Sequence, residues 1–477
     1  MPLLNRVRLR VFLILLLGFG MYVSSGDAAT VLVQLSGATT NWIGSDFPGL
    51  SFEMRDVLAD SSGNHFFSAS NKPLVSTFKT LGIKSLRVGG NTADDPKIPS
   101  PTEADVDALF TFAKAAGVKV IYTLRLNEGN RENATRMANY IFRNYKDRLA
   151  SFAIGNEPNV FSKEYAPYLA EWKKYAAEIT SATNSPDAKF CGPSTSPGHE
   201  SWAADFATEL ASTGWLAFVA QHDYPGGDAR RATNVVAARD KILSPAINEH
   251  YAKFAAHFVP AILSSGLPYR LEEANSFYDG GAENVSDTFA SALWALDYQW
   301  WWAEHGASGI NFHTGDKVAA RDPNKRCRYA VFWTVPGGYN IHPIGYALKM
   351  FSLGARGFLI STKIENSENL NVVAYAASPG AGRTYITLIN REHGENARSA
   401  SIILNSKIKN SRARAMFLTA PDGNVAAKTG IALGGAAIQD NAKWNGTWTP
   451  LGESADGIFN LKLPEASAAL IEIREKR

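Results

Sequence analysis

The chain has 477 residues, of which 45% are hydrophobic and 19% are charged, and its formal net charge is +3. This length predicts more than one domain, although a single barrel can absorb ~250 residues. The nearly neutral balance argues neither for nor against an acidic partner, and we expect no binding to nucleic acid. The sequence has no long charge run or low-complexity tract, which argues against a disordered interaction tail.

Residues 1–28 predict a secretory signal peptide. Three arginines precede a short apolar run at 11–17, and small residues follow near a cleavage point, at Gly26, Ala28 and Ala29. The alternative is a membrane anchor, which the run disfavours because it is short for a span of ~20 residues. We therefore expect a secreted protein (periplasmic in a Gram-negative bacterium) that has no membrane segment once mature.

Short apolar strands alternate with helical stretches from about residue 46 to 352. Helical patterns lie between the strands, for example at 103–116, 163–183 and 286–305. The eight strand candidates are 49–53, 85–90, 120–124, 151–154, 190–193, 218–221, 269–272 and 309–312. This alternation predicts an α/β fold with a (β/α)8 TIM barrel. An open doubly wound sheet is the alternative, and the lack of a glycine-rich phosphate turn after any strand disfavours it.

After residue 357 the pattern changes to short strands without helices. These strands are rich in β-branched and aromatic residues, at 358–362, 371–375, 384–389, 400–404, 415–418, 458–461 and 469–473. Regular short strands with turns between them predict an all-β sandwich. Segment 30–34 has the same character and would complete it. We therefore expect a catalytic barrel at 46–352 and a β-sandwich domain built from 29–45 and 353–477.

Glu157 stands at the end of the fourth predicted strand, between Asn156 and Pro158. A carboxylate at the exit of a barrel strand lies where such enzymes keep their chemistry. The proline fixes the turn because it cannot extend the hydrogen bonding of the strand. The asparagine amide can donate to a sugar hydroxyl. We interpret Glu157 as a candidate catalytic residue rather than part of a surface turn.

Glu273 stands at the end of the seventh predicted strand, beside Glu272. Because neighbours on a strand point to opposite faces, we expect only Glu273 to enter the pocket and Glu272 to be structural. Asn275 and Ser276 supply donors that could lower the pKa of the carboxylate, which suits a nucleophile. Two carboxylates on facing strands are the minimum for glycoside hydrolysis, and retention of configuration requires them ~5–5.5 Å apart.

Several segments together resemble glycoside hydrolase family 79, the family of β-glucuronidases and heparanases. The matching segments are Ile-Gly-Asn-Glu-Pro at 154–158, Leu-Glu-Glu-Ala-Asn-Ser at 271–276, Leu-Arg-Val-Gly-Gly-Asn at 86–91, Gly-Leu-Ser-Phe-Glu at 49–53, Phe-Ala-Ser-Ala-Leu-Trp at 289–294 and Asn-Phe-His at 311–313, with Tyr278 and the pair Gly280-Gly281. The resemblance spans the whole mature chain. It implies a barrel whose acid and nucleophile lie on strands four and seven.

By this resemblance Glu157 is the acid/base, Glu273 is the nucleophile and Asn156 holds the 2-hydroxyl of the sugar. Tyr224, in Gln-His-Asp-Tyr at 221–224, matches the tyrosine that orients the nucleophile. Glu53 and Asn91 match positions that bind distal hydroxyls.

The resemblance also places Tyr278, His313 and Tyr329 around the uronate end of the pocket. A substrate carboxylate must enter a pocket that already holds an ionised glutamate, so donors must stabilise its charge. The alternative for Tyr278 and Tyr329 is aromatic packing at a domain seam.

Other features have two interpretations each. The basic stretch 321–328 departs from the family pattern, particularly at Arg328, and is either a contact for acidic polysaccharide or a solvated loop. Cys191 and Cys327 either pair in an oxidising compartment or are separate buried thiols. The tryptophans at 300–302 favour helix packing over a sugar platform. We find no pattern for a cofactor, a nucleotide or a metal ion.

The sequence therefore predicts a secreted, monomeric, retaining exo-β-glucuronidase that acts on glucuronic-acid-containing glycans or glycosides. An endo-acting, heparanase-like enzyme on acidic polysaccharide is the near alternative. A carbohydrate-binding relative without turnover and a relative that acts on neutral sugars are the others.

Overall fold

Eight parallel strands close into a barrel in the computed structural model, which describes residues 29–318 and 325–476. The barrel strands are β2 (Pro48–Glu53), β3 (Ser85–Gly89), β4 (Lys119–Leu124), β5 (Leu149–Ile154), β6 (Phe190–Thr195), β7 (Leu216–Asp223), β8 (Tyr269–Ala274) and β9 (Ile310–His313). Strand β9 pairs with β2 and closes the ring. The predicted fold class, a TIM barrel with a C-terminal β-domain, is confirmed.

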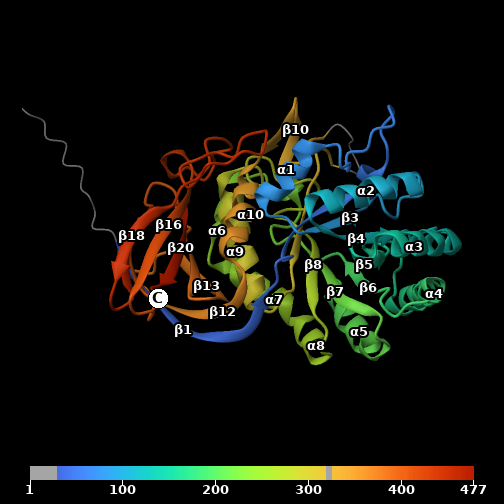
Figure 1. Cartoon of the computed structure of the whole chain (residues 1–477), viewed down its shortest axis with the longest axis horizontal. Helices are drawn as coiled ribbons and strands as arrows, with labels where there is room; N and C mark the ends of the chain where they lie inside the picture. The colour runs from blue at the N-terminus through green and yellow to red at the C-terminus, as the bar shows by residue number, and fades with distance from the viewer. Residues whose placement is uncertain (1–28, 319–324, 477) are drawn as a thin grey trace, which may run out of the picture.

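Helices surround the barrel on its outside (Figure 1). They are α1 (Lys72–Leu81), α2 (Glu103–Ala116), α3 (Arg131–Tyr145), α4 (Tyr165–Thr183), α5 (Glu200–Leu210), α6 (Val235–Leu243), α7 (Ala246–Ala256), α8 (Val259–Ser264), α9 (Phe289–Glu304) and α10 (Pro343–Gly354). Short 3-10 helices lie at η1 (Met54–Val57), η2 (Pro158–Val160), η3 (Ala211–Thr213), η4 (Ala229–Arg231) and η5 (Pro421–Gly423), and β10 (Phe332–Val335) forms a hairpin with β11 (Gly338–Ile341).

Local sequence signals set the ends of several helices. Thr102 caps α2 through its side chain, and Asp105 bonds back to the Thr102 backbone amide, which is a capping box. Gly82 and Gly117 end α1 and α2 in the left-handed conformation that glycine adopts without a steric penalty. These signals fix the start of α2 and the ends of α1 and α2.

The second domain is a single hydrogen-bonded sheet. Its strands are β1 (Ala29–Ile43), β12 (Gly357–Glu365), β13 (Val372–Gly380), β14 (Arg383–Asn390), β15 (Ala400–Asn405), β16 (Ser411–Thr419), β17 (Ala432–Leu433), β18 (Thr449–Ser454), β19 (Ile458–Leu463) and β20 (Ser467–Glu475). Strand β1, which precedes the barrel in the chain, pairs antiparallel with β12 and parallel with β15.

This sheet folds over to enclose its own core. Residues of strands near both ends of the strand order share one buried cluster, for example Ala415 of β16, Ile471 of β20 and Phe459 of β19. The pairing of β1 with β12 shifts register twice, after Leu35 and after Ala38. Such irregularities bend a strand and increase its twist, which allows the sheet to curl.

Helix α9 packs between the barrel and the sheet (Figure 1). Almost its whole surface is buried, and a helix that is hydrophobic all round belongs in a core. The Trp300 ring stacks on Tyr375 of β13, with centroids 5.6 Å apart. The interpretation of residues 300–302 as packing residues rather than a sugar platform therefore holds.

Several sequence predictions concern other parts of the chain. The signal peptide proposed for 1–28 lies outside the described residues. Within the described ranges no helix is long and apolar enough to cross a bilayer. Cys191 and Cys327 are both buried and unpaired, so the alternative of two separate thiols is correct.

A buried ion pair links the two domains. Asp297 of α9 accepts hydrogen bonds from Arg391 Nη1 (2.9 Å) and from the Tyr375 hydroxyl (2.6 Å). Both charged side chains are about 2% exposed or less. Removing one partner would leave the other charge buried without compensation, which is costly.

We expect Asp297→Ala to lower the free energy of unfolding by about 3–5 kcal/mol, because Arg391 loses its buried partner. Urea unfolding followed by circular dichroism measures this change. Glu178→Ala is the control, since it breaks an exposed bridge to Arg131 at 2.5 Å and should cost less than about 1 kcal/mol. Equal losses in the two variants would contradict the proposed role of the buried pair.

Candidate active site

A cavity of about 660 Å³ opens at the carboxyl ends of the barrel strands. Eight of the nine predicted site residues line it: Glu53, Asn91, Glu157, Tyr224, Glu273, Tyr278, His313 and Tyr329. The ninth, Asn156, is 4% exposed and lies beside the cavity under Glu157. Residues that are far apart in the chain thus converge on one space, at the face where barrel enzymes hold their sites.

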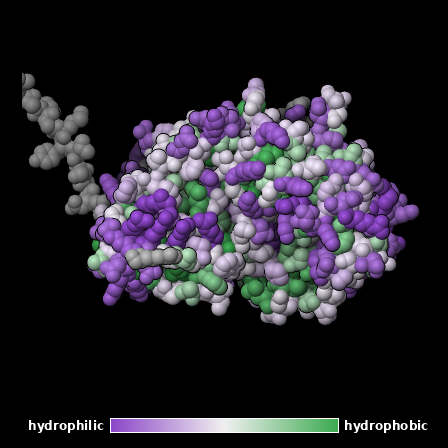
Figure 2. All heavy atoms as spheres, viewed as in Figure 1, coloured by the Kyte–Doolittle hydropathy of each residue, from purple (hydrophilic) through white to green (hydrophobic). Residues whose placement is uncertain are grey.

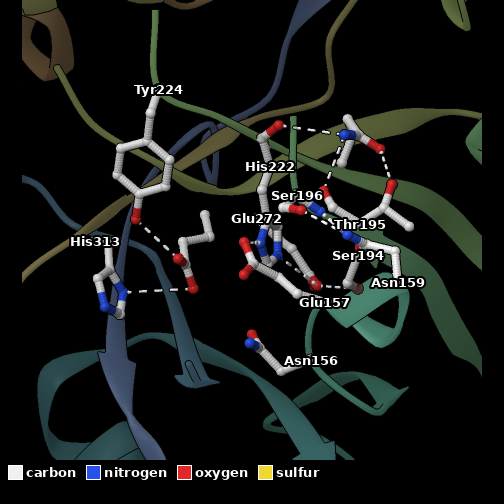
Figure 3. A network of polar contacts seen from close by, with 12 residues as sticks. Asn156, Glu157, Asn159, Ser194, Thr195, Ser196, His222, Tyr224, Glu272 and His313 are labelled. Atoms are coloured by element: carbon white, nitrogen blue, oxygen red, sulfur yellow. Dashed lines mark hydrogen bonds and ion pairs between the residues drawn. The ribbon is translucent and has the colours of Figure 1, made fainter. Parts of the chain in front are cut away.

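Glu157 is held in an unusual backbone conformation after β5. Its φ is +46°, in the left-handed region, and Gly155 before it has φ +84°. The Glu157 amide donates to the Ser194 carbonyl at 2.9 Å, and Pro158 begins the short helix η2. A non-glycine residue in this region is uncommon and is found at constrained positions such as active sites. The turn directs the Glu157 side chain toward the cavity (Figure 3).

Glu273 is surrounded by donors. Its Oε1 accepts from the Tyr224 hydroxyl at 2.8 Å, its Oε2 accepts from Arg87 Nη1 at 2.5 Å, and His313 Nδ1 lies 3.6 Å from Oε2. Burial raises the pKa of Glu273, but the charges of His313, His222 and Arg87 outweigh it and hold this pKa well below its usual value. The carboxylate is therefore ionised, as a nucleophile must be.

The donors that lower this pKa are not the ones that the sequence suggested. The Asn275 amide donates to the carbonyls of His313 and Tyr329, and the Ser276 hydroxyl donates to Asn275 and Ser286. Neither side chain bonds to Glu273. The explanation from turn donors is wrong, because the stabilising groups come from other strands across the barrel.

Only Glu273 of the pair lines the cavity, and Glu272 is a buried structural carboxylate, as expected, but the alternation of side chains that the expectation relied on is absent from β8. Against β7, Gln221 pairs with Leu271 and His222 pairs with Glu273, so Glu272 is an additional residue in the ladder. Such a β-bulge breaks the alternation of side chains. Glu272 accordingly points into the barrel as well, where it accepts hydrogen bonds from the Ser194 hydroxyl and the Cys191 thiol.

His222 lies between the carboxylates of Glu157 and Glu272 (Figure 3). Its Nδ1 is 3.0 Å from Glu157 Oε1, and its Nε2 is 3.7 Å from Glu272 Oε1. Burial lowers the pKa of His222, but Glu273, Glu157 and Glu272 raise it by more, to about 9. The imidazole is therefore a cation at neutral pH and donates to Glu157.

Arg87 of β3 connects the two candidate catalytic strands. Its side chain is fully buried, and Nη2 donates to Asn156 Oδ1 at 2.6 Å while Nη1 donates to Glu273 and to Ser51 Oγ. Arg87 also lies 4.0 Å from Glu272. With the Asn156 oxygen occupied in this way, the amide nitrogen of Asn156 is the group left to donate to a sugar hydroxyl.

Sequence reasoning assigned no role to Arg87, His222 or Ser51. A signal for Arg87 was present, because an arginine within the apolar strand 85–89 must be buried and therefore needs carboxylate partners. His222 lies two residues before Tyr224 in a segment that the family resemblance already included. The partners of both residues come from distant strands, so the sequence gives no direct sign of them.

Asp94 fixes the loops beside the site. Its carboxylate accepts hydrogen bonds from the backbone amides of Leu126 (2.7 Å), Asn127 (2.9 Å) and Asn156 (2.6 Å). These amides follow β4 and β5, so one buried carboxylate joins two neighbouring loops. The hydrogen bond to the Asn156 amide fixes the backbone immediately before Glu157.

The remaining predicted binding residues line the cavity near Glu273 and at its rim. Glu53 Oε2 accepts from the Thr92 amide and hydroxyl, and its Oε1 lies 3.5 Å from His313 Nε2. The Tyr329 ring lies 6.2 Å from Tyr224 and 5.8 Å from His313 between centroids. Tyr278 is 41% exposed at the rim of the cavity.

The basic stretch 321–328 is only partly described, since 319–324 lie outside the described residues. Arg328 pairs with Glu283 at 2.7 Å and approaches Asp287 at 3.8 Å. Its charge is therefore used in internal ion pairs.

One oxygen of Glu157, one oxygen of Glu273 and a His222 nitrogen all lie within 4.8 Å of one another. Such a group could in principle bind a metal ion. The proton on His222, held by a pKa of about 9, and the Arg87 guanidinium on Glu273 compete with a cation for these atoms. The arrangement is suited to proton transfer and nucleophilic attack at one carbon atom between two carboxylates.

The chain is similar in sequence to a β-glucuronidase of Aspergillus niger, with 25% identity over 317 residues. This match covers 56% of the chain and 58% of the relative, so the chain spans a little over half of the length of that relative. The relative agrees with the family resemblance that the motifs indicate, and that resemblance is confirmed. No family model matches the chain.

Solved structures share the fold at low identity. A 4-O-α-L-rhamnosyl-β-D-glucuronidase of Fusarium oxysporum 12S superposes with a TM-score of 0.71 at 17% identity, over 92% of this chain and 99% of that chain. A family 51 arabinofuranosidase of Xanthomonas axonopodis pv. citri superposes with a TM-score of 0.69 at 13% identity, over 94% and 100%. These similarities show the barrel and β-domain architecture.

We expect His222 to titrate near pH 9, because three carboxylates stabilise its cationic form. A raised pKa stabilises the fold fully below the unfolded value of 6.5, and this contribution is lost as the pH rises through about 9. NMR of histidine-labelled protein measures the pKa. The free energy of unfolding should fall by on the order of 3 kcal/mol over this range.

His250 is the internal control for this titration. Burial and Lys241 lower its pKa, so its signal should change below pH 6.5. If the signal that disappears in His222→Gln titrates below pH 7, the three-carboxylate environment of His222 is incorrect.

Proposed function

We propose that the protein is a secreted exo-acting β-glucuronidase that removes terminal β-D-glucuronic acid with retention of configuration. The observation that carries the proposal is the approach of Glu157 and Glu273 to within 4.8 Å in one cavity. Retaining glycosidases hold their carboxyl groups ~5–5.5 Å apart, whereas inverting enzymes need ~6.5–9.5 Å to admit a water molecule. The similarity to a β-glucuronidase supports the choice of sugar.

In the first step Glu273 attacks the anomeric carbon while the Glu157 carboxylic acid protonates the leaving glycosidic oxygen. In the second step the Glu157 carboxylate takes a proton from water, which attacks the glycosyl-enzyme ester and releases β-glucuronate. Glu157 is the more accessible of the two, with 16% of its side chain exposed against 8% for Glu273. This difference suits a residue that must exchange protons with a leaving group and with water.

The cations around Glu273 support this chemistry before the substrate binds. Arg87 and His222 oppose the negative charges of Glu272 and Glu273. Burial lowers the pKa of His313, but Glu273 and Glu53 raise it by more. A substrate carboxylate therefore enters a site in which Arg87 and His222 already offset the charges of two buried carboxylates. Tyr278 and Tyr329 are the side chains that we assign to that carboxylate, since hydroxyl groups can donate to it.

The exo mode is supported by the basic residues of the cavity. Arg230 pairs with Asp228 at 2.7 Å, and Lys241 donates to the Gly226 carbonyl at 2.9 Å. Among the described lining residues only Arg230 and Lys241 carry a fixed positive charge, and Asp228 offsets that of Arg230, which leaves Lys241 as the single uncompensated cation for a long polyanion along the cleft.

Azide rescue tests the two assigned roles. Glu157→Ala should lose about 10²–10⁴-fold in rate on a glucuronide with a poor leaving group, and with dinitrophenyl glucuronide and azide it should yield β-glucuronyl azide. Glu273→Ala should have no turnover of its own and should yield α-glucuronyl azide, because azide then attacks from the vacated side. NMR of the products distinguishes the anomers.

Glu178→Ala, on the outer surface, is the control and should keep the rate of the unmodified protein. An unchanged rate in Glu157→Ala would instead indicate a carbohydrate-binding protein without this chemistry. The same azide anomer from both variants would refute the assignment of roles.

Aryl glycosides that differ only at carbon six test the sugar. We expect the glucuronide to be hydrolysed faster than the glucoside and the xyloside by at least tenfold in kcat/KM, which is about 1.4 kcal/mol of transition-state stabilisation. Equal or faster turnover of the neutral glycosides would overturn recognition of the carboxylate. Turnover of a long heparan chain without turnover of aryl glucuronide would favour the endo mode instead.

A further inference from the structure

Three arginines lie side by side on neighbouring strands of the β-domain. Arg383 of β14 pairs directly with Arg474 of β20, which in turn pairs with Arg412 of β16. Directly opposed residues project from the same face, with Cβ atoms about 4.5–5.5 Å apart, and like charges in such positions are destabilising. A row of this kind needs a compensating anion.

The protein itself supplies part of that compensation, because Glu453 of β18 stands opposite Arg412 and forms an ion pair with Lys476. Glu472 accepts from Arg414 Nε at 2.5 Å and pairs with Arg474 Nη2 at 2.9 Å. No described residue forms an ion pair with Arg383 or Arg412, and both are exposed. Nε of Arg474 is buried and has no hydrogen-bond partner within the described part of the chain. The exposed guanidinium groups of Arg383 and Arg412 are therefore available to a ligand, whereas Arg474 is partly occupied by Glu472.

The row borders a hollow that could admit a ligand. A cavity of about 460 Å³ is lined by Ala381, Gly382, Arg383, Arg412, Arg474, Glu475 and Lys476. A second cavity, of about 360 Å³, is lined by Arg412, Ala413, Arg414, Pro450, Gly452, Glu453, Glu472 and Arg474, so two carboxylates accompany its three arginines. Volumes of this size are in the range of small-molecule sites. Figure 2 shows hydrophilic residues gathered over the region that Figure 1 labels β16, β18 and β20.

Aromatic rings hold two further guanidinium groups nearby. The Arg414 guanidinium lies 4.4 Å from the Trp448 ring centroid, and that of Arg356 lies 5.3 Å from the Tyr385 ring centroid. Stacking restricts a long side chain, so less entropy is lost when it binds an anion. We call Arg356, Arg383, Arg412, Arg414, Arg474 and Lys476 together the arginine surface.

The arginine surface is separate from the cleft. Arg356 follows the C-terminal end of α10, and Gly354 at that end packs against Tyr385. Helices of a TIM barrel run antiparallel to its strands, so their C-terminal ends lie at the face opposite to the active site. None of the residues that line the 660 Å³ cavity belongs to this surface.

We propose that the arginine surface binds an acidic polysaccharide, whose carboxylates pair with Arg383, Arg412 and Arg474. The guanidinium fork matches a carboxylate in two parallel hydrogen bonds, and three forks in a row match anions repeated along an extended chain. The ligand chemistry is that of a uronate polymer. Binding there would hold the enzyme on a polymer and raise the local concentration of chain ends at the cleft.

Binding to immobilised hyaluronan tests the proposal, with all proteins carrying Glu273→Ala so that the polymer stays intact. We expect Arg383→Ala/Arg412→Ala to weaken binding at least tenfold at low salt, and we expect the affinity of the parent to fall as salt rises. Arg143→Ala/Lys146→Ala removes two exposed charges from the α3 region and should change the affinity less than twofold. The urea midpoint of the arginine variant should be unchanged or higher, because like charges are removed.

Three results would overturn the proposal: no binding of hyaluronan by the parent, an equal loss in the α3 control, or tighter binding of polyphosphate than of hyaluronan. With Glu273 restored, Arg383→Ala/Arg412→Ala should hydrolyse aryl glucuronide within twofold of the unmodified rate. If the unmodified protein fails to hydrolyse aryl glucuronide while its Glu273→Ala form binds hyaluronan through the arginine surface, the proposed function alone is refuted, so the two ideas fail separately.

Discussion

The buried guanidinium of Arg87 is the constraint on which the site depends. A fully buried cation must have anionic partners, because the loss of its hydration is otherwise uncompensated. Arg87 finds Glu273 on β8 and Asn156 after β5, and it lies close to Glu272. One side chain on the second barrel strand therefore determines where groups from the fourth and seventh strands lie relative to each other.

The bulge in β8 turns this pairing into a network. Because the bulge brings both Glu272 and Glu273 into the barrel, His222 and Arg87 each lie within 4.0 Å of the Glu272 carboxylate as well. Glu273, Glu157 and Glu272 together keep His222 cationic against its burial, and the cation donates to Glu157. The ionised state of Glu273 and the hydrogen bond from His222 to Glu157 thus both depend on this buried network.

The β-domain contributes in two ways. Through α9 and the buried pair of Asp297 and Arg391, it covers the side of the barrel that carries β8 and β9. Its strands β14, β20 and β16 also carry a row of arginines that neighbouring carboxylates offset only in part. A cleft that recognises one terminal sugar and a remote surface that recognises repeated carboxylates would divide the binding of a polymer between two places.

The sequence by itself determined the strand and helix order of the barrel, the change to β-structure after residue 357, and the identity of Glu157 and Glu273 as the candidate pair. These features are local: each follows from periodicity, from capping residues, or from a short motif at the end of a strand. The tertiary structure alone decided the orientation of Glu272, the partners of Arg87 and His222, and the row of Arg383, Arg474 and Arg412. Each of those depends on register between strands that are distant in the chain, and a shift of one residue in that register changes which side chains meet.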